Sequence, residues 1–337
     1  MNHQPLGAPQ LSHVPNARPF WGRDLVSTRD LGSQETNTLL NLTGRVKAHP
    51  ANFRRALAGK QLTMFFEKPS LRTRLTFEAG MASLGGVSFF VDQTQSRIDA
   101  REKLSDIAHN LERWVDIVVL RTFSHSTVEQ MAEHACIPVI NALSDLEHPC
   151  QALADYFTLQ EKFGDVRDVK LAYVGDGNNV AHSLLLTCAA LGSSISIAAP
   201  PGYEPDPQII TEAQEIAEQT GANVCLSHDP GEAVDGADAV YTDVWASMGQ
   251  EHEAGHRSSI FLPFQVNETL MARANEGAVF MHCLPAHRGD EVTDAVIDSP
   301  CSIVFDQAEN RMHIQKAILL SLLGGGMDRF PVRSAHA

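Results

Sequence analysis

The sequence lacks several features that would assign it to other classes of protein. No apolar run among its 337 residues reaches the roughly 18 residues that a membrane-spanning helix needs. Residues 1–20 are polar and rich in proline, without the apolar segment of a secretory signal. Basic residues are scarce: 26 Lys and Arg stand against 41 Asp and Glu, a formal net charge of −15. We therefore expect no membrane segment and no broad surface for nucleic acid, although a few arginines in a cleft can still bind a small anion.

Cysteine is sparse as well. The six cysteines contain no C-x-x-C pair, which argues against a zinc ribbon. Without a secretory signal, they are expected to be reduced thiols in the cytoplasm. The chain does have an ordinary share of hydrophobic residues, 43%, with 20% charged, so wholesale disorder is excluded. Its length suggests two domains.

Short apolar runs alternate with helical patterns after an N-terminal arm, residues 1–33, that is expected to dock near Phe20–Leu25. Strands are predicted at Leu62–Phe66, Ser88–Val91, Asp116–Leu120 and Pro138–Ile140, and helices over Arg72–Leu84, Ser105–Trp114, Thr127–Ala135 and Gln151–Phe163. This β-α-β-α order predicts a parallel sheet with helices on both faces.

The same alternation restarts near residue 169. Strands are predicted at Val169–Val174, Ser194–Ala198, Ala239–Thr242 and Val279–Met281, and helices over Val180–Leu191, Pro207–Thr220 and Gln307–Leu323. Two successive halves of this kind predict an α/β protein with two doubly wound parallel-sheet domains, divided near residue 150, and an active-site cleft between them. Ligands of such sheets lie at the carboxyl ends of the strands, so the loops there carry the candidate site.

The first candidate loop, residues 67–74, follows a strand and opens a helix. Ser70 is a good N-cap, and the amides after it lack helical partners, so they form an anion site at the positive end of the helix dipole. Arg72 adds a planar fork for phosphate oxygens, and Thr73 adds a hydroxyl. The pattern alone fits a capped helix with solvated arginines equally well.

Two further segments of the first half carry polar side chains to the predicted cleft. Arg121 leaves a buried strand, and His148, before Pro149, is followed by Gln151 at the start of a helix. His148 and Gln151 are interpreted as hydrogen-bond donors to a polarised carbonyl oxygen. Taken singly, a surface ion pair and a structural histidine are the commoner alternatives.

The second half offers a loop that partly resembles a dinucleotide fingerprint, VGDGNNV. The third glycine position is Val180, and no clean strand ends in an acidic residue about 20 positions later, where a ribose hydroxyl would be held. Asn178 and Asn179 suit a polar ligand group instead. Asp243 follows a later strand, where a carboxylate suits an ammonium group, although an Asp-capped loop explains it as well.

Four more residues invite functional interpretations. His282, Cys283 and His287 raise a zinc hypothesis, which is disfavoured because no cysteine pair completes a ligand shell. The thiol of Cys283, near several arginines, is expected to have a lowered pKa. Arg311 is placed in the first turn of the last helix, where it opposes the dipole unless it faces an anion. Together, the arginines predict a site for a phosphate donor, and the Asp and Asn side chains predict a site for an amine.

Seven ordered segments resemble motifs of the ornithine carbamoyltransferase family, in the aspartate/ornithine carbamoyltransferase superfamily. They are SLRTR, LRTFSH, DLEHPCQALAD, VGDGNNVAHS, DVWASMGQE, HCLPAHRG and AENRMHIQK, and they span about residues 20 to 325. The resemblance implies transfer of the carbamoyl group from carbamoyl phosphate to the δ-amine of L-ornithine, giving L-citrulline and phosphate. It implies a homotrimer or multiple of trimers with shared sites, and no metal or organic cofactor. Arginine biosynthesis is the expected role, while arginine breakdown, which runs the reaction backwards, stays open on the sequence.

The resemblance also assigns residues and domains. The implied catalytic residues are Arg121, His148, Asp243 and Cys283. The implied carbamoyl-phosphate ligands are Ser70, Leu71, Arg72, Thr73, Arg97, Arg121, His148, Gln151, Cys283, Leu284 and Arg311. The implied ornithine ligands are Asn179, Asp243, Ser247 and Met248, and a cis Leu284–Pro285 bond is expected. Residues 34–150 with the C-terminal helix 308–325 would form the carbamoyl-phosphate domain, and residues 151–307 the ornithine domain.

Two positions depart from the family pattern. The family usually has Ser-Thr-Arg-Thr, so Leu71 removes a hydroxyl, which we expect to weaken phosphate binding by about 1 kcal/mol. Arg97 stands where the family has a Gln on a loop that reaches a neighbouring subunit's site. We therefore predict that Arg97 adds a phosphate contact from the adjacent chain.

Other functions stay open on the sequence alone. A sister carbamoyltransferase for putrescine, an acylated ornithine or aspartate would share the donor site and differ near residues 243–249. An NAD-dependent dehydrogenase depends on the VGDGNN segment alone. A non-catalytic homologue would have to explain why His148, Gln151, Asp243 and Cys283 are all present.

Overall fold

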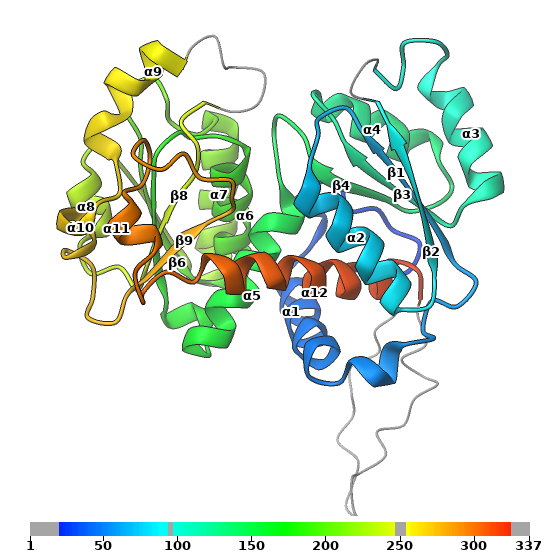
Figure 1. The fold of residues 1–337 in the computed structure, drawn as a ribbon, viewed down its shortest axis with the longest axis horizontal. Helices are drawn as coiled ribbons and strands as arrows, with labels where there is room; N and C mark the ends of the chain where they lie inside the picture. Colours follow the sequence, from blue (N-terminus) through cyan, green and yellow to red (C-terminus); the bar gives the residue numbers. More distant parts are fainter. Residues whose placement is uncertain (1–19, 94–96, 247–253, 325–337) are drawn as a thin grey trace, which may run out of the picture.

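Two parallel β-sheets, each covered by helices, form the two lobes of the chain (Figure 1). The computed structural model describes residues 20–93, 97–246 and 254–324. Both sheets are parallel throughout, so their central strands are buried on both faces and consist of continuous apolar runs, as this architecture requires. The prediction of an α/β fold with two doubly wound sheets is confirmed.

The first sheet has the strand order β2-β1-β3-β4. Its strands are β1 (Gln61–Phe66), β2 (Val87–Asp92), β3 (Ile117–Arg121) and β4 (Val139–Leu143), connected by α2 (Leu71–Ser83), α3 (Leu104–Trp114) and α4 (His125–His134). The chain adds β2 on one side of β1 and then β3 on the other side, so the strand order changes direction between β1 and β3. A crevice therefore opens at the carboxyl ends of these two strands, which is where doubly wound sheets bind ligands.

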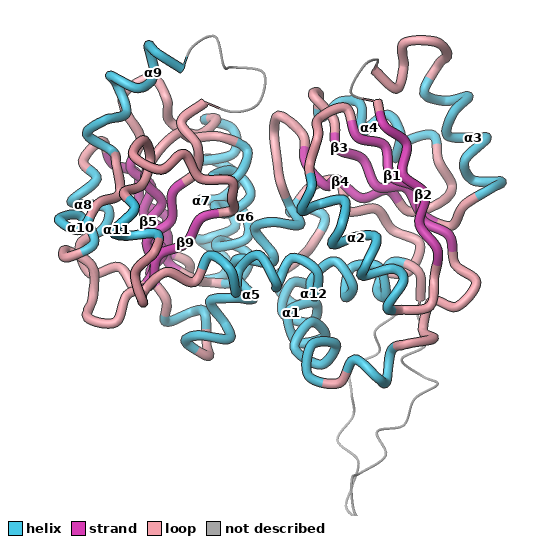
Figure 2. The backbone as a smooth tube through the Cα atoms, in the orientation of Figure 1, coloured by secondary structure: helices cyan, strands magenta, loops and turns pink. Residues whose placement is uncertain are grey.

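The second sheet has the order β7-β6-β5-β8-β9. Its strands are β5 (Lys170–Val174), β6 (Ser194–Ala198), β7 (Asn223–Ser227), β8 (Ala239–Thr242) and β9 (Val279–His282). Its helices are α6 (Asn179–Leu191), α7 (Pro207–Thr220), α8 (Pro230–Val234), α9 (Ala254–Phe261), α10 (Glu268–Met271) and α11 (Asp294–Ile297). Here the reversal lies between β5 and β8. Figure 2 shows the two sheets in magenta on either side of the helices that join them.

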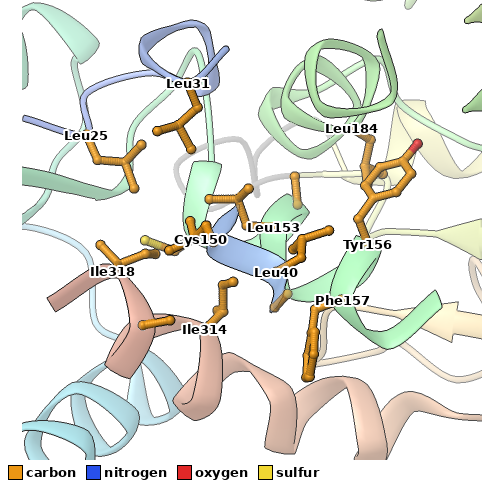
Figure 3. Close-up of a cluster of buried hydrophobic side chains, with 14 of the residues drawn as sticks. Leu25, Leu31, Leu40, Cys150, Leu153, Tyr156, Phe157, Leu184, Ile314 and Ile318 are labelled. Carbon is orange, nitrogen blue, oxygen red and sulfur yellow. The ribbon is translucent and has the colours of Figure 1, made fainter. Parts of the chain in front are cut away.

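Three helices hold the lobes together: α1 (Ser33–Ala48), α5 (Pro149–Phe163) and α12 (Val304–Leu322). α12 leaves the second lobe and packs against α1, α2 and α5 of the first, while α5 also packs against α6. Figure 3 shows their shared core, in which Leu40, Leu153 and Ile314 are 0–1% exposed. This one core spans both lobes, so the helices set how the two sheets face each other.

The N-terminal segment docks as predicted. Phe20 and Leu25 are buried, and the amide of Leu25 donates to the Val139 carbonyl beside β4. Glu147, fully buried, accepts hydrogen bonds from the hydroxyls of Ser27 and Thr28. The segment is thereby joined to the residue that precedes His148.

Several predicted boundaries were wrong. The last helix begins at Val304 rather than near residue 307, so Arg311 lies at the end of its second turn, and the argument from an unfavourable dipole does not apply. The fourth strand extends to Leu143. Helix α1 and strand β7 were not predicted, because α1 is rich in Thr and Asn and β7 is an edge strand with exposed residues. Within the described residues, no helix is long and apolar enough to cross a membrane.

Candidate active site

A cavity of about 400 Å³ lies where the carboxyl ends of the two sheets face each other. It is lined by residues from both lobes, including Ser70 and Arg72 after β1, Arg121 at the end of β3, Asp243 after β8 and Cys283 after β9. The two points of strand reversal thus open into one space. Segments far apart in sequence meet there, as the sequence analysis predicted.

The N-terminus of α2 forms one wall. Ser70 is its N-cap, and its hydroxyl accepts from the amide of Thr73 at 3.3 Å, which leaves the amides of Leu71 and Arg72 at the end of the helix dipole. Thr73 is fully buried beneath this turn. Its hydroxyl oxygen accepts from Ser70 at 2.9 Å and from Nη2 of Arg311 at 2.6 Å. Thr73 therefore supports the anion site by holding two other ligands in place.

Three arginines converge beside this helix end. Arg121 and Arg311 are 5% and 4% exposed, and Arg72 is half-buried. Within the described residues, none of the three pairs with a carboxylate. Burial, followed by the neighbouring charge of Arg311, lowers the pKa of Arg121 to about 9. Such a concentration of uncompensated positive charge is stable only with an anion, so this wall fits a phosphate group.

His148 lies between the arginines and the second lobe. Its backbone amide donates to the hydroxyl of Ser183 at 2.9 Å, which ties it to α6. Burial, followed by the charges of Arg311 and Arg121, holds its pKa well below the usual value. The ring is therefore neutral near pH 7, and its Nδ1 has no partner among the described residues. A neutral imidazole can offer one N–H to a ligand oxygen.

Gln151 lies in the first turn of α5, and its amide is held by a hydrogen bond within that helix. Its Nε2 donates to Oδ1 of Asp155 at 2.7 Å. Its Oε1 has no partner within the described chain. One N–H of the Gln151 amide is thereby engaged, and its second N–H is still available, so the expectation that Gln151 donates to a carbonyl oxygen stays a prediction. Gln151 lines the cavity with a buried acceptor, Oε1, that is unpaired among the described residues.

The opposite wall centres on Asp243. Its Oδ2 accepts from Nδ2 of Asn178 at 2.8 Å, and its Oδ1 accepts from the Cys283 thiol at 3.0 Å. Asn179 donates to the Ser144 carbonyl at 2.6 Å and lines the cavity. A buried carboxylate held by neutral donors suits an ammonium group.

The predicted lowering of the Cys283 pKa was wrong. Burial raises this pKa well above the usual value, and the charge of Asp243 raises it further. The arginines are outweighed because the sulfur is buried and, in addition, is in direct contact with Asp243. Cys283 is thus a protonated thiol that donates a hydrogen bond, which does not suit a nucleophile.

The loop after β9 is held in an unusual conformation. The Leu284–Pro285 bond is cis, as expected, and Leu284 has a φ of 58°. The Leu284 amide donates to Nδ1 of His282 at 2.9 Å, and Nε2 of His282 lies 3.2 Å from Glu291. Both ring nitrogens are therefore occupied, which fixes the imidazole as a support for the loop.

A possible metal-ligand cluster does occur here, with a different composition from the one considered on sequence. Donor atoms of Asp243, His282 and Cys283 lie within 4.8 Å of one another, and His287 is not a member. The residues do not fit a resident metal well, because His282 would have to release the Leu284 amide or Glu291 to become a ligand.

The glycines of the VGDGNN loop have a packing role. A Cβ at Gly177 would lie 2.2 Å from the backbone nitrogen of Pro205, and the Gly177 amide donates to the Tyr203 carbonyl at 2.8 Å. Asn178 caps α6 through Val180 and Ala181. Glycine is required at position 177 because the backbone near Pro205 packs against it, and not because a ligand approaches. This does not favour a dinucleotide at the turn.

Some predicted site residues lie elsewhere. Leu71 is at the cavity edge with 72% of its surface exposed. Arg97 is exposed, forms an ion pair with Asp99 at 3.2 Å and lies away from the cavity of its own chain. Ser247 and Met248 lie outside the described residues.

Sequence reasoning also missed residues. Lys68 and His287 line the cavity. Neither of them was assigned to the substrate site from the sequence, although both lie in segments that were considered. Asp155 was missed as the partner of Gln151, although a carboxylate four residues further on a helix shares the same face. That spacing was the available signal.

The fold and cavity define an enzyme of two α/β domains, in which a cationic wall on one domain faces a carboxylate on the other. The family description "Aspartate/ornithine carbamoyltransferase, carbamoyl-P binding domain" matches residues 23–161, and "Aspartate/ornithine carbamoyltransferase, Asp/Orn binding domain" matches residues 167–322. The chain therefore belongs to the aspartate/ornithine carbamoyltransferase family.

Individual relatives are similar over most of their length. An ornithine carbamoyltransferase of Thermococcus kodakarensis is 50% identical over 306 residues, which are 90% of this chain and 97% of the relative. A relative in Pyrococcus furiosus, described as anabolic ornithine carbamoyltransferase, is also 50% identical over 306 residues, with the same shares of 90% and 97%. The solved ornithine carbamoyltransferase structure from Pyrococcus furiosus has a TM-score of 0.88, covering 91% of this chain and 98% of that one.

Proposed function

We propose that this chain transfers the carbamoyl group of carbamoyl phosphate to the δ-amine of L-ornithine, giving L-citrulline and phosphate. The observation that carries the proposal is the cavity that Arg121, Arg311 and Asp243 line together, in which neither arginine pairs with a carboxylate among the described residues. The cationic wall takes the phosphate donor, and the carboxylate takes the amino acid. The relative in Pyrococcus furiosus is described as anabolic, so we place the reaction in arginine biosynthesis.

The donor would bind with its phosphate at the start of α2. The free amides after Ser70 and the guanidinium groups of Arg72 and Arg311 supply donors suited to a dianion. The carbonyl oxygen would lie toward Arg121 and His148, whose Nε and Nδ1 are unpaired. Gln151 would accept from the carbamoyl NH₂ through Oε1.

The reaction requires a neutral δ-amine, because an ammonium group has no lone pair. The amine nitrogen attacks the carbonyl carbon, and negative charge develops on the carbonyl oxygen, where Arg121 and neutral His148 stabilise it. The C–O bond to phosphate then breaks with its electron pair on the phosphate, and the proton lost by the amine leaves on the phosphate. The rest of the acceleration comes from holding two reactants in one cavity.

The acceptor would be held by its α-ammonium group at Asp243. Asn178 and the Cys283 thiol fix this carboxylate from two sides, so it is oriented before the substrate arrives. Because Cys283 is protonated and already donates to Asp243, direct transfer is favoured over a covalent acyl-enzyme. The residues proposed at the acceptor site also include Asn179, Ser247 and Met248.

A competition assay tests the proposal. Purified protein is given carbamoyl phosphate with ornithine, putrescine, N-acetylornithine or aspartate in parallel, and the carbamoylated product is quantified. The account predicts citrulline with a strong preference for ornithine. Activity only with another amine would preserve the donor site and overturn the reading of Asp243.

The assembly is proposed to be a homotrimer or a multiple of trimers. Apolar side chains are exposed together on α2 and the edge strand β2, namely Leu71, Leu75, Val87 and Phe89. Glu67, buried, accepts from the amides of Ile98 and Phe123, which fixes the segment that carries Arg97 beside β1. Arg97 would then reach the phosphate site of the neighbouring chain. Light scattering tests the assembly, and an unchanged KM for carbamoyl phosphate in Arg97→Gln would refute the contact.

The six cysteines are free thiols, which agrees with the reducing compartment expected from the sequence. The cytoplasmic location stays a prediction.

A further inference from the structure

A buried polar network lies behind the cavity, where α5, α12, β8 and β9 meet. Its centre is Asp155 on α5, which is 0% exposed. One carboxylate oxygen, Oδ1, accepts from Nε2 of Gln151 and from Nε2 of Gln307, each at 2.7 Å. The other, Oδ2, has no partner within the described chain. A buried carboxylate between two amides is costly, so its position calls for a functional reason.

The orientation of Gln307 is set independently of Asp155. Its Oε1 accepts from the amide of His282 at 2.9 Å, so its amino group must face the other way. Its Nε2 therefore donates to Asp155, and also lies 3.1 Å from the hydroxyl of Tyr241. The carboxylate oxygen is thereby fixed as an acceptor from the second lobe.

This arrangement dictates the orientation of Gln151. A carboxylate that accepts from Gln307 can interact with a second amide only through its amino group. Oε1 of Gln151 is consequently turned away from Asp155, buried and unpaired, on a residue that lines the cavity. An unpaired buried acceptor favours a ligand that brings a hydrogen-bond donor to that point.

We propose that Asp155 is a positioning residue that makes the site specific for a donor bearing an NH₂ group, by fixing the Gln151 amide with its oxygen toward the substrate. The inference deepens the proposed function and rests on it. Carbamoyl phosphate supplies the donor to Oε1. Acetyl phosphate has the same shape with a methyl group in place of NH₂, so it leaves that oxygen unpaired. A site that hydrogen-bonds a group rejects the isostere that lacks it, by roughly 10- to 100-fold for a single neutral acceptor.

The test compares the KM for carbamoyl phosphate with the competitive inhibition constants of acetyl phosphate and inorganic phosphate. The wild-type chain is expected to bind acetyl phosphate more weakly than carbamoyl phosphate. In Asp155→Ala, Gln151 is free to rotate, and we expect the ratio of the two constants to fall about 10-fold. Inhibition by inorganic phosphate should be unchanged. Asp155→Asn keeps an acceptor oxygen but loses the charge, so its ratio should match that of the wild-type chain at pH 6, where Asp155 is mostly protonated.

A matched control separates positioning from general support of the helices. Thr158 lies one turn further along α5, is buried and accepts from Asn310 of α12 at 3.0 Å, but does not line the cavity. Thr158→Val removes a similar link between the same helices and should lower the melting temperature without changing the ratio.

Two outcomes would overturn the inference. In one, Asp155→Ala weakens both acyl phosphates equally, or Thr158→Val shifts the ratio as much. In the other, used if Asp155→Ala does not fold, Gln151→Met keeps the wild-type discrimination although it has no acceptor oxygen. A wild-type chain that makes no citrulline would instead refute the proposed function, so the two failures are distinct.

Discussion

The two walls of the cavity are built by the same architectural device and carry opposite chemistry. Each lies at the point where its sheet reverses strand order, between β1 and β3 in one lobe and between β5 and β8 in the other. The first wall has buried arginines that pair with no carboxylate in the described parts of the chain, whereas the second has a carboxylate with two neutral donors. The fold supplies the position of each wall, and the side chains at the strand ends supply the charge.

The comparison explains how an acidic protein binds a dianion. Net charge acts over the whole surface, while Arg121 and Arg311 are buried side chains that line one cavity. The two walls should therefore respond separately to substitution, one through the donor and one through the acceptor.

The largest effect is expected on the donor wall. In Arg121→Met, the developing charge on the carbonyl oxygen loses a buried donor, so kcat should fall about 10²- to 10³-fold. Initial rates of citrulline formation at saturating substrates measure it. Arg45→Met, on the exposed face of α1, is the control and should be near wild type. An unchanged kcat for Arg121→Met would show that Arg121 does not stabilise the charge that develops on the carbonyl oxygen.

A smaller effect is expected on the acceptor wall. Asp243→Asn removes the charge that binds the α-ammonium group, and the KM for ornithine should rise on the order of 10²-fold. The KM for carbamoyl phosphate should change little, because Asp243 belongs to the other wall. Equal changes in both constants would show that the walls are not independent.

The pH dependence of activity should reflect the ionisation of Asp155, the centre of the buried polar network behind the cavity. Burial raises the pKa of Asp155 to about 7, while hydrogen bonds from Gln307 and Gln151 and the charge of Arg311 lower it. Tyr241 of β8 and Cys283 after β9 also face this carboxyl.

Two consequences follow for Asp155. Because the pKa of Asp155 is higher in the folded chain than in the unfolded chain, the free energy of unfolding falls as pH rises from about 4 to 7 and is constant above that. Its ionised form holds the Gln151 amide, so kcat/KM for carbamoyl phosphate should fall about tenfold between pH 8 and pH 6. Ionisation of the ornithine amine also slows the reaction at low pH, so the measured quantity is the ratio of wild type to Asp155→Asn. A ratio independent of pH would contradict the assignment.

The smallest effect is expected at the edge of the donor wall. Leu71→Thr places a hydroxyl at the start of α2 and should lower the KM for carbamoyl phosphate about 5-fold, the equivalent of one hydrogen bond. If Arg97 of a neighbouring chain compensates for Leu71, Arg97→Gln should raise that KM less in the Leu71→Thr background. Additive effects in the double variant would exclude compensation.

Much of this arrangement could be predicted from the sequence, because it depends on local signals. Apolar runs marked the strands, and Ser70, Arg121 and Asp243 come at or within four residues of the ends of those runs, so the fold rule alone placed them at the carboxyl edges of the two sheets. What the sequence did not show depended on tertiary contacts. The Gln151 amide is held by Asp155, which also accepts from Gln307, 152 residues away from Asp155. The pKa of Cys283 is raised by burial and then by a contact with Asp243 across 40 residues.

The most direct test of the central claim is the ornithine dependence of wild-type activity, measured with Asp243→Asn beside it. The account predicts that citrulline forms from carbamoyl phosphate and ornithine far faster than product forms from putrescine, N-acetylornithine or aspartate, and that Asp243→Asn removes most of this preference. If another amine is preferred, or if the variant keeps the wild-type preference for ornithine, the assignment of the two walls is contradicted.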